Sequence, residues 1–590
     1  MAPAALDPEQ AAIVAHDGGP LLVVAGPGAG KTRVLTRALA HRVGQGLPPE
    51  RCLAVTFTRR ARDELRERLA GQAGDAAGRI TVATFHGLGL LILREQCKRL
   101  GLDAGLKVAD EPTRLAVLRQ LSAGDKPAAL ASRISASKRT VAPVPGSPAA
   151  PEAGDADAAL AARYDAVLRE RGLVDMDDLL TVPVALLGGD EELAASYRSR
   201  WTDVFVDEYQ DVDELQYRLL RLLTSADSRV CVIGDPDQAI YGFRGGDVGY
   251  FLRFRSDFPA ADSVQLSRGY RSAPTIIRAA MQLIRPGTLV PGRELVPART
   301  DIPDGPVAVV TAADERDEAE TIAAEIEKML GGASFHALDS RAVDGRNRSQ
   351  HQLSFADFAV LYRTTAQAAA VGEALGKRGF PFQRRSHERL ADMAGAAEIL
   401  AALSAPVLDS AAVPVAGRLD AAVRAALTAT ADAEAVMAIK TAADVLGPLA
   451  ARCGADLDRF LDELALGAEV DTWDPRADRI SLLTLHASKG LEFPVVFIPG
   501  CDDGLLPLRP WRGAEVDYAE ERRLFFVGMT RATTRLVLLS AAQRSLRGTV
   551  TSCTPSPFLS SVDPALLDRV SGPGAGRARR RDKAQQPRLF

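Results

Sequence analysis

Short runs of apolar residues recur along the chain, and several end abruptly in glycines or carboxylates. Three of them are Leu21–Val24, Val204–Val206 and Val230–Ile233. A continuous apolar run of about four to eight residues is typical of a strand that is buried on both faces. The segment 31–43 follows the first run after a glycine-rich turn and has the pattern of a helix. These runs therefore predict buried strands whose ends carry polar residues.

The turn after the first strand has the sequence AGPGAGKT. Its glycines, Gly26, Gly28 and Gly30, let backbone N–H groups converge on phosphate oxygens beside a helix N-terminus. Lys31 supplies a cation for the β- and γ-phosphates, and the Thr32 hydroxyl can ligate Mg²⁺. The order of strand, turn, Lys-Thr and helix predicts a nucleotide-binding loop rather than an ordinary glycine-rich turn.

Two adjacent acids, Asp207 and Glu208, follow the second apolar run. Taken alone, such a pair is more typical of a solvated strand end with a helix N-cap. Together with the phosphate loop it favours chemistry. We expect Asp207 to hold Mg²⁺, directly or through a water, and Glu208 to orient and deprotonate the attacking water.

The third apolar run leads into the sequence GDPDQAIYGFRGGD. Gln238 is predicted to reach the γ-phosphate or the water. Two aromatic residues and a cation follow, Tyr241, Phe243 and Arg244. This combination suits base stacking and phosphate contact, with ordinary core packing as the alternative.

Composition limits the class of protein. The chain has 590 residues, enough for several domains, and 47% hydrophobic with 25% charged residues, as in globular proteins. No apolar run approaches the ~18 residues of a membrane span, and the start of the chain lacks a signal-peptide pattern. Six scattered cysteines without a CxxC pair argue against a zinc or iron–sulfur site and fit a reducing cytoplasm. With a net charge of −4, nucleic-acid binding requires a local groove.

In their order along the chain, these motifs resemble those of superfamily 1 DNA helicases of the UvrD, PcrA and Rep kind. The matching stretches cover nearly the whole chain and read LDPEQAAIV, AGPGAGKT, LAVTFTRRARDEL, ITVATFHGLG, FVDEYQD, GDPDQAIYGFRG, LSRGYRS, LLTLHASKGLEFPVVFIPG and EERRLFFVGMTRA. The resemblance implies two RecA-like P-loop NTPase motor domains of the α/β class, with ATP and Mg²⁺ as cofactors.

For the adenosine end of the nucleotide, the resemblance implies four residues. Gln10 would read the adenine edge. Arg33 and Tyr270 would enclose the ring, one by a cation–π contact and one by stacking. Glu492 would bind the ribose.

For the phosphate end, the resemblance implies that Arg271 and Arg531 point at the γ-phosphate. Arg531 would be the finger that stabilises charge in the transition state. Because Arg531 and Lys31 lie far apart in sequence, they are expected on two domains, with a nucleotide cleft that closes on binding and opens on hydrolysis.

The resemblance also implies a track of single-stranded DNA, because aromatic faces stack on any base. This chain departs from the usual residues in three places: Phe243 replaces a Trp, Gly269 replaces an Asn, and Arg59-Arg60 replaces Asn-Lys. For the two histidines in the set, a structural hydrogen bond is the alternative. The residues expected at the DNA are Phe57, Thr84, His86, Tyr241, Phe243, Arg244 and His486.

The motif map predicts that a mainly helical insertion interrupts each motor domain. The second insertion is shorter than is usual in the family and lacks the glycine-containing helix-hairpin that grips duplex DNA. The stretch 141–159 is expected to be a loop, and 331–352 a loop or a hairpin of unknown purpose. The predicted parts are 1–88 and 175–268 (first motor domain), 89–174 (first insertion), 269–382 and 478–570 (second motor domain), 383–477 (second insertion) and 571–590 (flexible basic tail).

The expected function is an ATP-driven 3′→5′ translocase or helicase on single-stranded DNA or 3′-tailed duplex DNA, in a cytoplasm and near the nucleoid. The alternatives are a DNA-bound scaffold that ATP switches, a protein-displacing translocase with little unwinding, and an RNA track. A small-molecule kinase would not explain the distant arginines, and the stretch after Phe558 is short for a helicase–nuclease. The final QPRLF resembles a sliding-clamp peptide, with Gln586, Leu589 and Phe590 as the docking residues.

Overall fold

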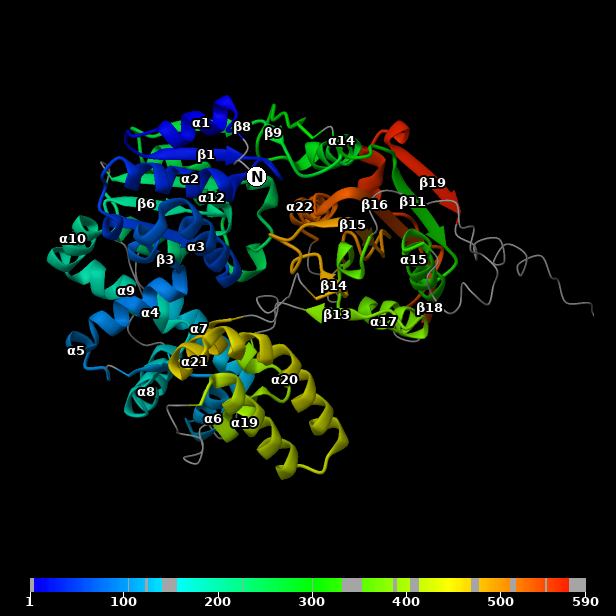
Figure 1. Cartoon of the computed structure of the whole chain (residues 1–590). Helices are drawn as coiled ribbons and strands as arrows, with labels where there is room; N and C mark the ends of the chain where they lie inside the picture. Colours follow the sequence, from blue (N-terminus) through cyan, green and yellow to red (C-terminus); the bar gives the residue numbers. More distant parts are fainter. Residues whose placement is uncertain are drawn as a thin grey trace, which may run out of the picture.

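In the computed structural model, the N-terminal half of the chain contains a six-stranded parallel sheet (Figure 1). Its strand order is β3-β2-β6-β7-β1-β8. The strands are β1 (Leu21–Ala25), β2 (Cys52–Thr56), β3 (Thr81–Thr84), β6 (Asp203–Val206), β7 (Arg229–Gly234) and β8 (Asp262–Leu266). The structure describes residues 5–103, 105–121, 126–140, 156–225, 228–299, 301–331, 353–385, 390–403, 413–467, 477–509, 516–546 and 549–571.

Both faces of this sheet are buried, as its apolar runs predict. In β6, Val204 and Val206 pack into one core and Phe205 packs into the other. Helices therefore cover each face. One face carries α1 (Pro8–Ala15), α2 (Lys31–Gly44) and α3 (Arg59–Ala73); the other carries α4 (Phe85–Glu95), α9 (Asp178–Gly189), α10 (Glu191–Arg200), α11 (Glu214–Leu222), α12 (Gly249–Leu252) and α13 (Phe254–Asp257).

A second parallel sheet of seven strands follows, in the order β13-β14-β12-β15-β16-β11-β19. Alternate residues of β12 pack on its two faces: Leu361 faces one core, and Val360 and Tyr362 face the other. The strands are β11 (Val307–Ala312), β12 (Phe358–Tyr362), β13 (Phe382–Arg385), β14 (Ile480–Thr484), β15 (Phe493–Ile498), β16 (Ala532–Ala541) and β19 (Leu567–Ser571). The helices are α14 (Pro274–Ile284) and α22 (Tyr518–Met529) on one face and α15 (Glu315–Met329) and α17 (Gln367–Lys377) on the other.

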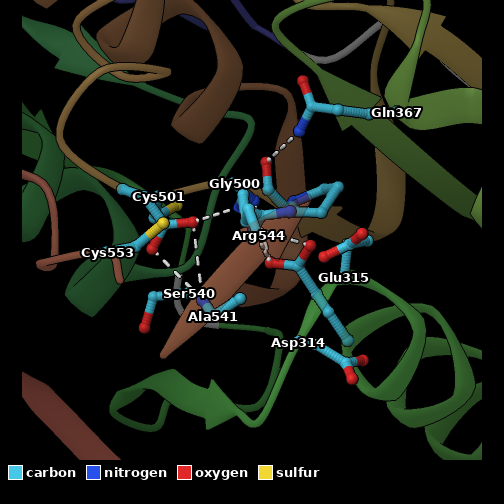
Figure 2. A network of polar contacts seen from close by, with 12 residues as sticks. Asp314, Glu315, Gln367, Gly500, Cys501, Ser540, Ala541, Arg544 and Cys553 are labelled. Atoms are coloured by element: carbon cyan, nitrogen blue, oxygen red, sulfur yellow. Dashed lines mark hydrogen bonds and ion pairs between the residues drawn. The ribbon is translucent and has the colours of Figure 1, made fainter. Parts of the chain in front are cut away.

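A buried ion network holds the carboxyl edge of this second sheet together. Arg544 lies in β17 (Gln543–Leu546), which pairs with β18 (Thr549–Ser552). Its guanidinium donates to both carboxylate oxygens of Glu318 at 2.8 Å and to Asp502 at 2.6 Å. Figure 2 shows Arg544 beside Gly500 within this network of polar contacts. The network ties α15, through Glu318, to the turn after β15, through Asp502, and to β17.

The predicted insertions are mainly helical and lie side by side below the two sheets (Figure 1). The first contains α5 (Cys97–Leu100), β4 (Lys107–Val108), α6 (Glu111–Leu121), α7 (Pro127–Thr140), α8 (Ala156–Glu170) and β5 (Leu173–Val174). The second contains α18 (Ala396–Leu403), α19 (Val415–Ala429), α20 (Ala433–Cys453) and α21 (Leu457–Leu466), packed around one apolar core. We keep the five-part domain division as our proposal.

The second insertion also docks on α3 and α4 through acids of α21. Arg94 donates to both oxygens of Asp462, at 2.7 and 2.9 Å. Glu463 accepts from Arg59 at 2.6 Å and from Arg62 at 2.9 Å. The cation of Arg59 therefore binds the insertion, although its place in the sequence is beside the expected DNA track.

Some predicted features fall wholly or partly outside the described residues. The loop expected at 141–159 is described only from Ala156, where α8 begins, so the prediction is wrong for its last residues. Of 331–352 only Gly331 is described, and of the tail 571–590 only Ser571. Within the described ranges, no helix has the length and apolar character that a bilayer crossing requires.

Candidate nucleotide site and nucleic-acid interface

The glycine-rich turn joins β1 to α2 as the sequence predicts. Gly28 and Gly30 have φ of 69° and 85°, a region that favours glycine. A β-carbon on Gly28 would come within 2.5 Å of the Arg271 β-carbon, and the Tyr270 N–H donates to the Gly28 oxygen at 2.9 Å. The backbone of 270–271 thus lies directly on the loop, so these glycines serve close approach as well as turn geometry.

The acid pair lies at the carboxyl end of β6, facing the loop. Asp207 is buried, and its N–H donates to the Val55 oxygen at 2.9 Å. Among the described residues, Glu208 is the non-glycine with a positive φ, at 52°. Its carboxylate lies 2.8 Å from the Lys31 Nζ. A strained backbone at such a position is typical of functional sites.

Charge in this group is unevenly distributed. Burial and the neighbouring Glu208 raise the pKa of Asp207 to about 7. Burial alone would also raise the pKa of Glu208, but Lys31 and Lys489 outweigh it and lower that pKa to about 2. Burial likewise opposes the charge of Lys31, yet the surrounding carboxylates raise its pKa overall. A negative charge on Asp207 is therefore disfavoured unless a cation lies beside it.

A hard divalent cation fits these donors. The Asp207 carboxylate and the Thr32 hydroxyl are oxygen ligands of the kind that Mg²⁺ prefers, and the crowded carboxylates would gain from a neighbouring cation. Bound there, Mg²⁺ would neutralise charge on the nucleotide phosphates.

Gln238 links the two motor domains at this site. Its Nε2 donates to Asp235 at 2.5 Å, and its Oε1 accepts from Arg531 at 3.4 Å. Arg531 lies in the turn between α22 and β16 and is only 2% exposed. Burial and the nearby Arg271 lower its pKa to about 9. Two arginines that disfavour each other's charge form a site suited to an anion.

The predicted adenosine residues gather around the start of α2. Gln10 donates to the Ala29 oxygen at 3.1 Å, and Arg33 donates to the Ala5 oxygen at 3.2 Å. A β-carbon on Gly30 would contact both side chains. The Tyr270 hydroxyl donates to Asp7 at 2.5 Å. Glu492 contacts Arg271 at 2.6 Å, so two predicted nucleotide ligands pair with each other here.

Most of the predicted DNA aromatics also meet at one place. Phe57 stacks on Tyr241 with ring centroids 5.1 Å apart. Phe243 is edge-on to His486 at 5.2 Å, and Arg244 lies 5.5 Å from the Phe243 ring. Tyr241 is 3% exposed whereas Phe243 is 64% exposed. Phe243 is therefore the ring that is available to a base.

Thr84 and His86 lie at the N-terminal turn of α4 rather than in the aromatic group. The Thr84 hydroxyl accepts from the Gly87 N–H at 3.1 Å and caps the helix. This contact gives Thr84 a structural role that its motif did not predict. Its assignment to DNA stays a prediction, as does that of His86.

Lys489 is a residue of the site that the sequence reasoning missed. Its ammonium contacts the buried Asp211, donates to the Gln238 backbone oxygen at 2.6 Å and lies 5.1 Å from the Tyr241 ring centre. Lys489 comes from the second motor domain and these partners come from the first. The signal that could have identified it is its position in the quoted motif, within HASKGLEF. This lysine connects the aromatic group to the phosphate site.

Two parallel sheets, with a phosphate loop on the first and Arg271 and the buried Arg531 from the second, define a two-domain P-loop NTPase motor. The model of the UvrD/REP helicase N-terminal domain matches residues 6–259, and that of the UvrD-like helicase C-terminal domain matches 264–406 and 432–543. The chain belongs to the UvrD-like helicase family of superfamily 1.

Named relatives match over most of their length. The chain is similar to the ATP-dependent DNA helicase UvrD1 of Mycobacterium tuberculosis, with 31% identity over 95% of this chain and 86% of the relative. It is also similar to the ATP-dependent DNA helicases PcrA of Leuconostoc citreum (29%, over 95% and 85%) and of Staphylococcus aureus (28%, over 96% and 87%).

Proposed function

We propose that the protein is an ATP-driven motor that moves 3′→5′ along single-stranded DNA and opens 3′-tailed duplexes, in DNA repair, replication or recombination. The observation that carries this proposal is the convergence of both motor domains on one site: Arg531 reaches Gln238, and Lys489 reaches Asp211. A nucleotide that binds there contacts two bodies at once. Its hydrolysis can therefore change their separation.

The residues have distinct roles in the proposed cycle. Lys31 leaves Glu208 to bind the β- and γ-phosphates, which frees the Glu208 carboxylate to take a proton from the attacking water. Thr32 and Asp207 would hold Mg²⁺. Gln238 positions the water or the γ-phosphate. Arg271 and Arg531 stabilise the phosphate charge that grows in the transition state.

Movement requires that this chemistry reach the DNA. Lys489 contacts Asp211 and the Gln238 backbone on one side and the Tyr241 ring on the other. Phe243, which lies next to Tyr241 with centroids 6.2 Å apart, presents the exposed stacking face. A single side chain, that of Lys489, thus links the γ-phosphate site to the aromatic residues that are proposed to bind bases. This proximity supports translocation over a scaffold that ATP merely switches.

The hydrolysis assignment is tested with Glu208→Gln. This variant keeps the shape of the side chain and removes the base, so turnover should fall by about 10²-fold or more. It also removes the ion pair in which Glu208 competes with the phosphates for Lys31. The affinity for ATP should therefore not fall. Lys31→Ala is the matched comparison and should weaken nucleotide binding itself. Turnover by Glu208→Gln above a tenth of the parent rate would disprove the proposed base.

The direction of movement is tested with single-stranded oligonucleotides that carry a tightly bound protein block at one end. A 3′→5′ motor displaces a block at the 5′ end. Displacement from the 3′ end alone would contradict the proposal. ATP-dependent DNA binding without displacement from either end would favour the scaffold that ATP switches. Equal stimulation of the ATPase by RNA would show that the protein also acts on single-stranded RNA.

The C-terminal peptide is a separate proposal that lies outside the described residues. Gln586, Leu589 and Phe590 would dock on a sliding clamp, whereas a basic arm that touches phosphates is the simpler interpretation. Clamp binding by the parent and by Leu589→Ala/Phe590→Ala is measured at a salt concentration that suppresses non-specific attraction. Binding that the double variant loses would support docking. Equal clamp binding by the parent and the double variant, or no binding by either, would support only the basic arm that touches phosphates.

A further inference from the structure

A segment of the second motor domain lies on the first motor domain beside the phosphate loop. The segment, residues 285–297, follows α14, whose residues pack in the core of the second sheet. Its strand β10 (Val296–Pro297) pairs with β9 (Arg268–Gly269). A β-carbon on Gly26 would come within 2.7 Å of Leu295 and 3.1 Å of Arg293. The segment therefore contacts the phosphate loop itself.

Arg293 is the buried cation of this segment, with its side chain 3% exposed. Its Nη1 donates to Asp235 at 2.6 Å and to Asp237 at 2.8 Å. Its Nη2 donates to the other oxygen of Asp235 at 2.9 Å and to the Ala25 oxygen at 3.4 Å. One guanidinium thus joins the end of β1, where the phosphate loop starts, to the acids that follow β7.

The acids bound by Arg293 continue toward the reacting phosphate. The Asp235 oxygen that accepts from Nη2 also accepts from Gln238 at 2.5 Å. Gln238 in turn accepts from Arg531 at 3.4 Å. Asp237 is bound from the other side by the Thr288 hydroxyl and the Leu289 N–H, both at 2.7 Å. The contacts run without a gap from the phosphate loop through Arg293 to the arginine finger.

We propose that Arg293 is a positioning residue for ATP hydrolysis, which sets the orientation of Gln238 through Asp235. The planar fork of Arg293 binds both oxygens of Asp235 and leaves the carboxylate one orientation in which it can accept from Gln238. A lysine would keep the charge but has no fork to fix that orientation. This inference rests on the proposed role of Gln238 and Arg531 at the γ-phosphate.

The competing account is that Arg293 only neutralises two buried carboxylates. A residue of that kind affects stability and nucleotide affinity, whatever residue stands at 238. A positioning residue instead lowers kcat while the KM for ATP changes little. Its effect also vanishes when Gln238 is removed, because it acts through that side chain.

The test uses the full-length protein, ATP, saturating oligo-dT and four variants: Arg293→Lys, Gln238→Ala, their double variant, and the control Arg285→Lys. Arg285 lies on the same segment and is exposed, so its replacement should leave turnover unchanged. Arg293→Lys avoids the uncompensated buried acids that Arg293→Ala would create. Thermal melting and binding of a fluorescent ATP analogue are measured in parallel.

We expect Arg293→Lys to lower kcat by about tenfold with a KM within about twofold of the parent. In the Gln238→Ala background the same change should lower kcat by less than about twofold. A full additional loss in that background, or a kcat for Arg293→Lys equal to that of the control, would overturn the proposal. If Arg293→Lys melts too early to assay, Asp235→Asn replaces it under the same criteria. Failure of the proposed function is separate, because it appears as normal turnover by Gln238→Ala or Glu208→Gln.

Discussion

Replacing Phe243 with alanine is the most direct test of the base-stacking group. The ring is 64% exposed, so its removal takes little apolar surface out of the protein core. We expect the free energy of unfolding to change by less than about 1 kcal/mol. A base that stacks on this ring contributes about 1–3 kcal/mol, so affinity for single-stranded DNA should fall about 5-fold to 150-fold.

The assay is fluorescence anisotropy with a labelled oligo-dT, together with the oligo-dT concentration that half-saturates the ATPase. Tyr518→Ala is a matched control, since that ring is 51% exposed and packs on Phe558, which is not one of the residues predicted to bind DNA. Phe243→Trp should bind DNA more tightly than the parent, because its stacking face is larger. Tyr241→Ala should instead lower the free energy of unfolding, because that ring is 3% exposed and its removal leaves a cavity. An unchanged DNA affinity for Phe243→Ala would refute the assignment of this ring to the track.

Four further results are expected. Arg544→Met leaves two acids buried without their cation and should lower the free energy of unfolding by about 3–5 kcal/mol in chemical denaturation. Burial raises the pKa of Glu318 to about 7 from 4.5, so the folded protein binds more protons than the unfolded chain between these values. Stability from this group should therefore fall as pH rises from 4.5 to 7, and Glu318→Gln should flatten that slope in melts across the range. Asp462→Asn weakens a half-exposed pair with Arg94 by about 1 kcal/mol or less, and a larger fraction of undocked second insertion should appear by distance measurements between labelled helices α3 and α20. Removing Mg²⁺ with a chelator should abolish turnover without a change in far-ultraviolet circular dichroism, and a loss of helix signal would contradict a purely catalytic metal.

Local chemistry decided what could be predicted from the sequence. The apolar runs at β1, β6 and β7 fixed buried strands, and the residues that follow them had to meet at one sheet edge because parallel strands share that edge. The phosphate loop, Asp207 and Glu208 therefore needed no tertiary information beyond the strand assignment. The spacing of AGPGAGKT also predicted the start of α2, which begins at Lys31.

The tertiary structure decided which partners each charge has. The sequence places Arg59 beside a DNA motif, yet its guanidinium binds Glu463, about 400 positions along the chain. Phe243 and Tyr241 are two residues apart and chemically similar, but packing between the domains buries one and leaves the other exposed. Arg293 carries no motif, and only folding brings it to Ala25 and Asp235. Burial makes such long-range pairs strong and specific, and burial is a property of the assembled chain rather than of any local pattern.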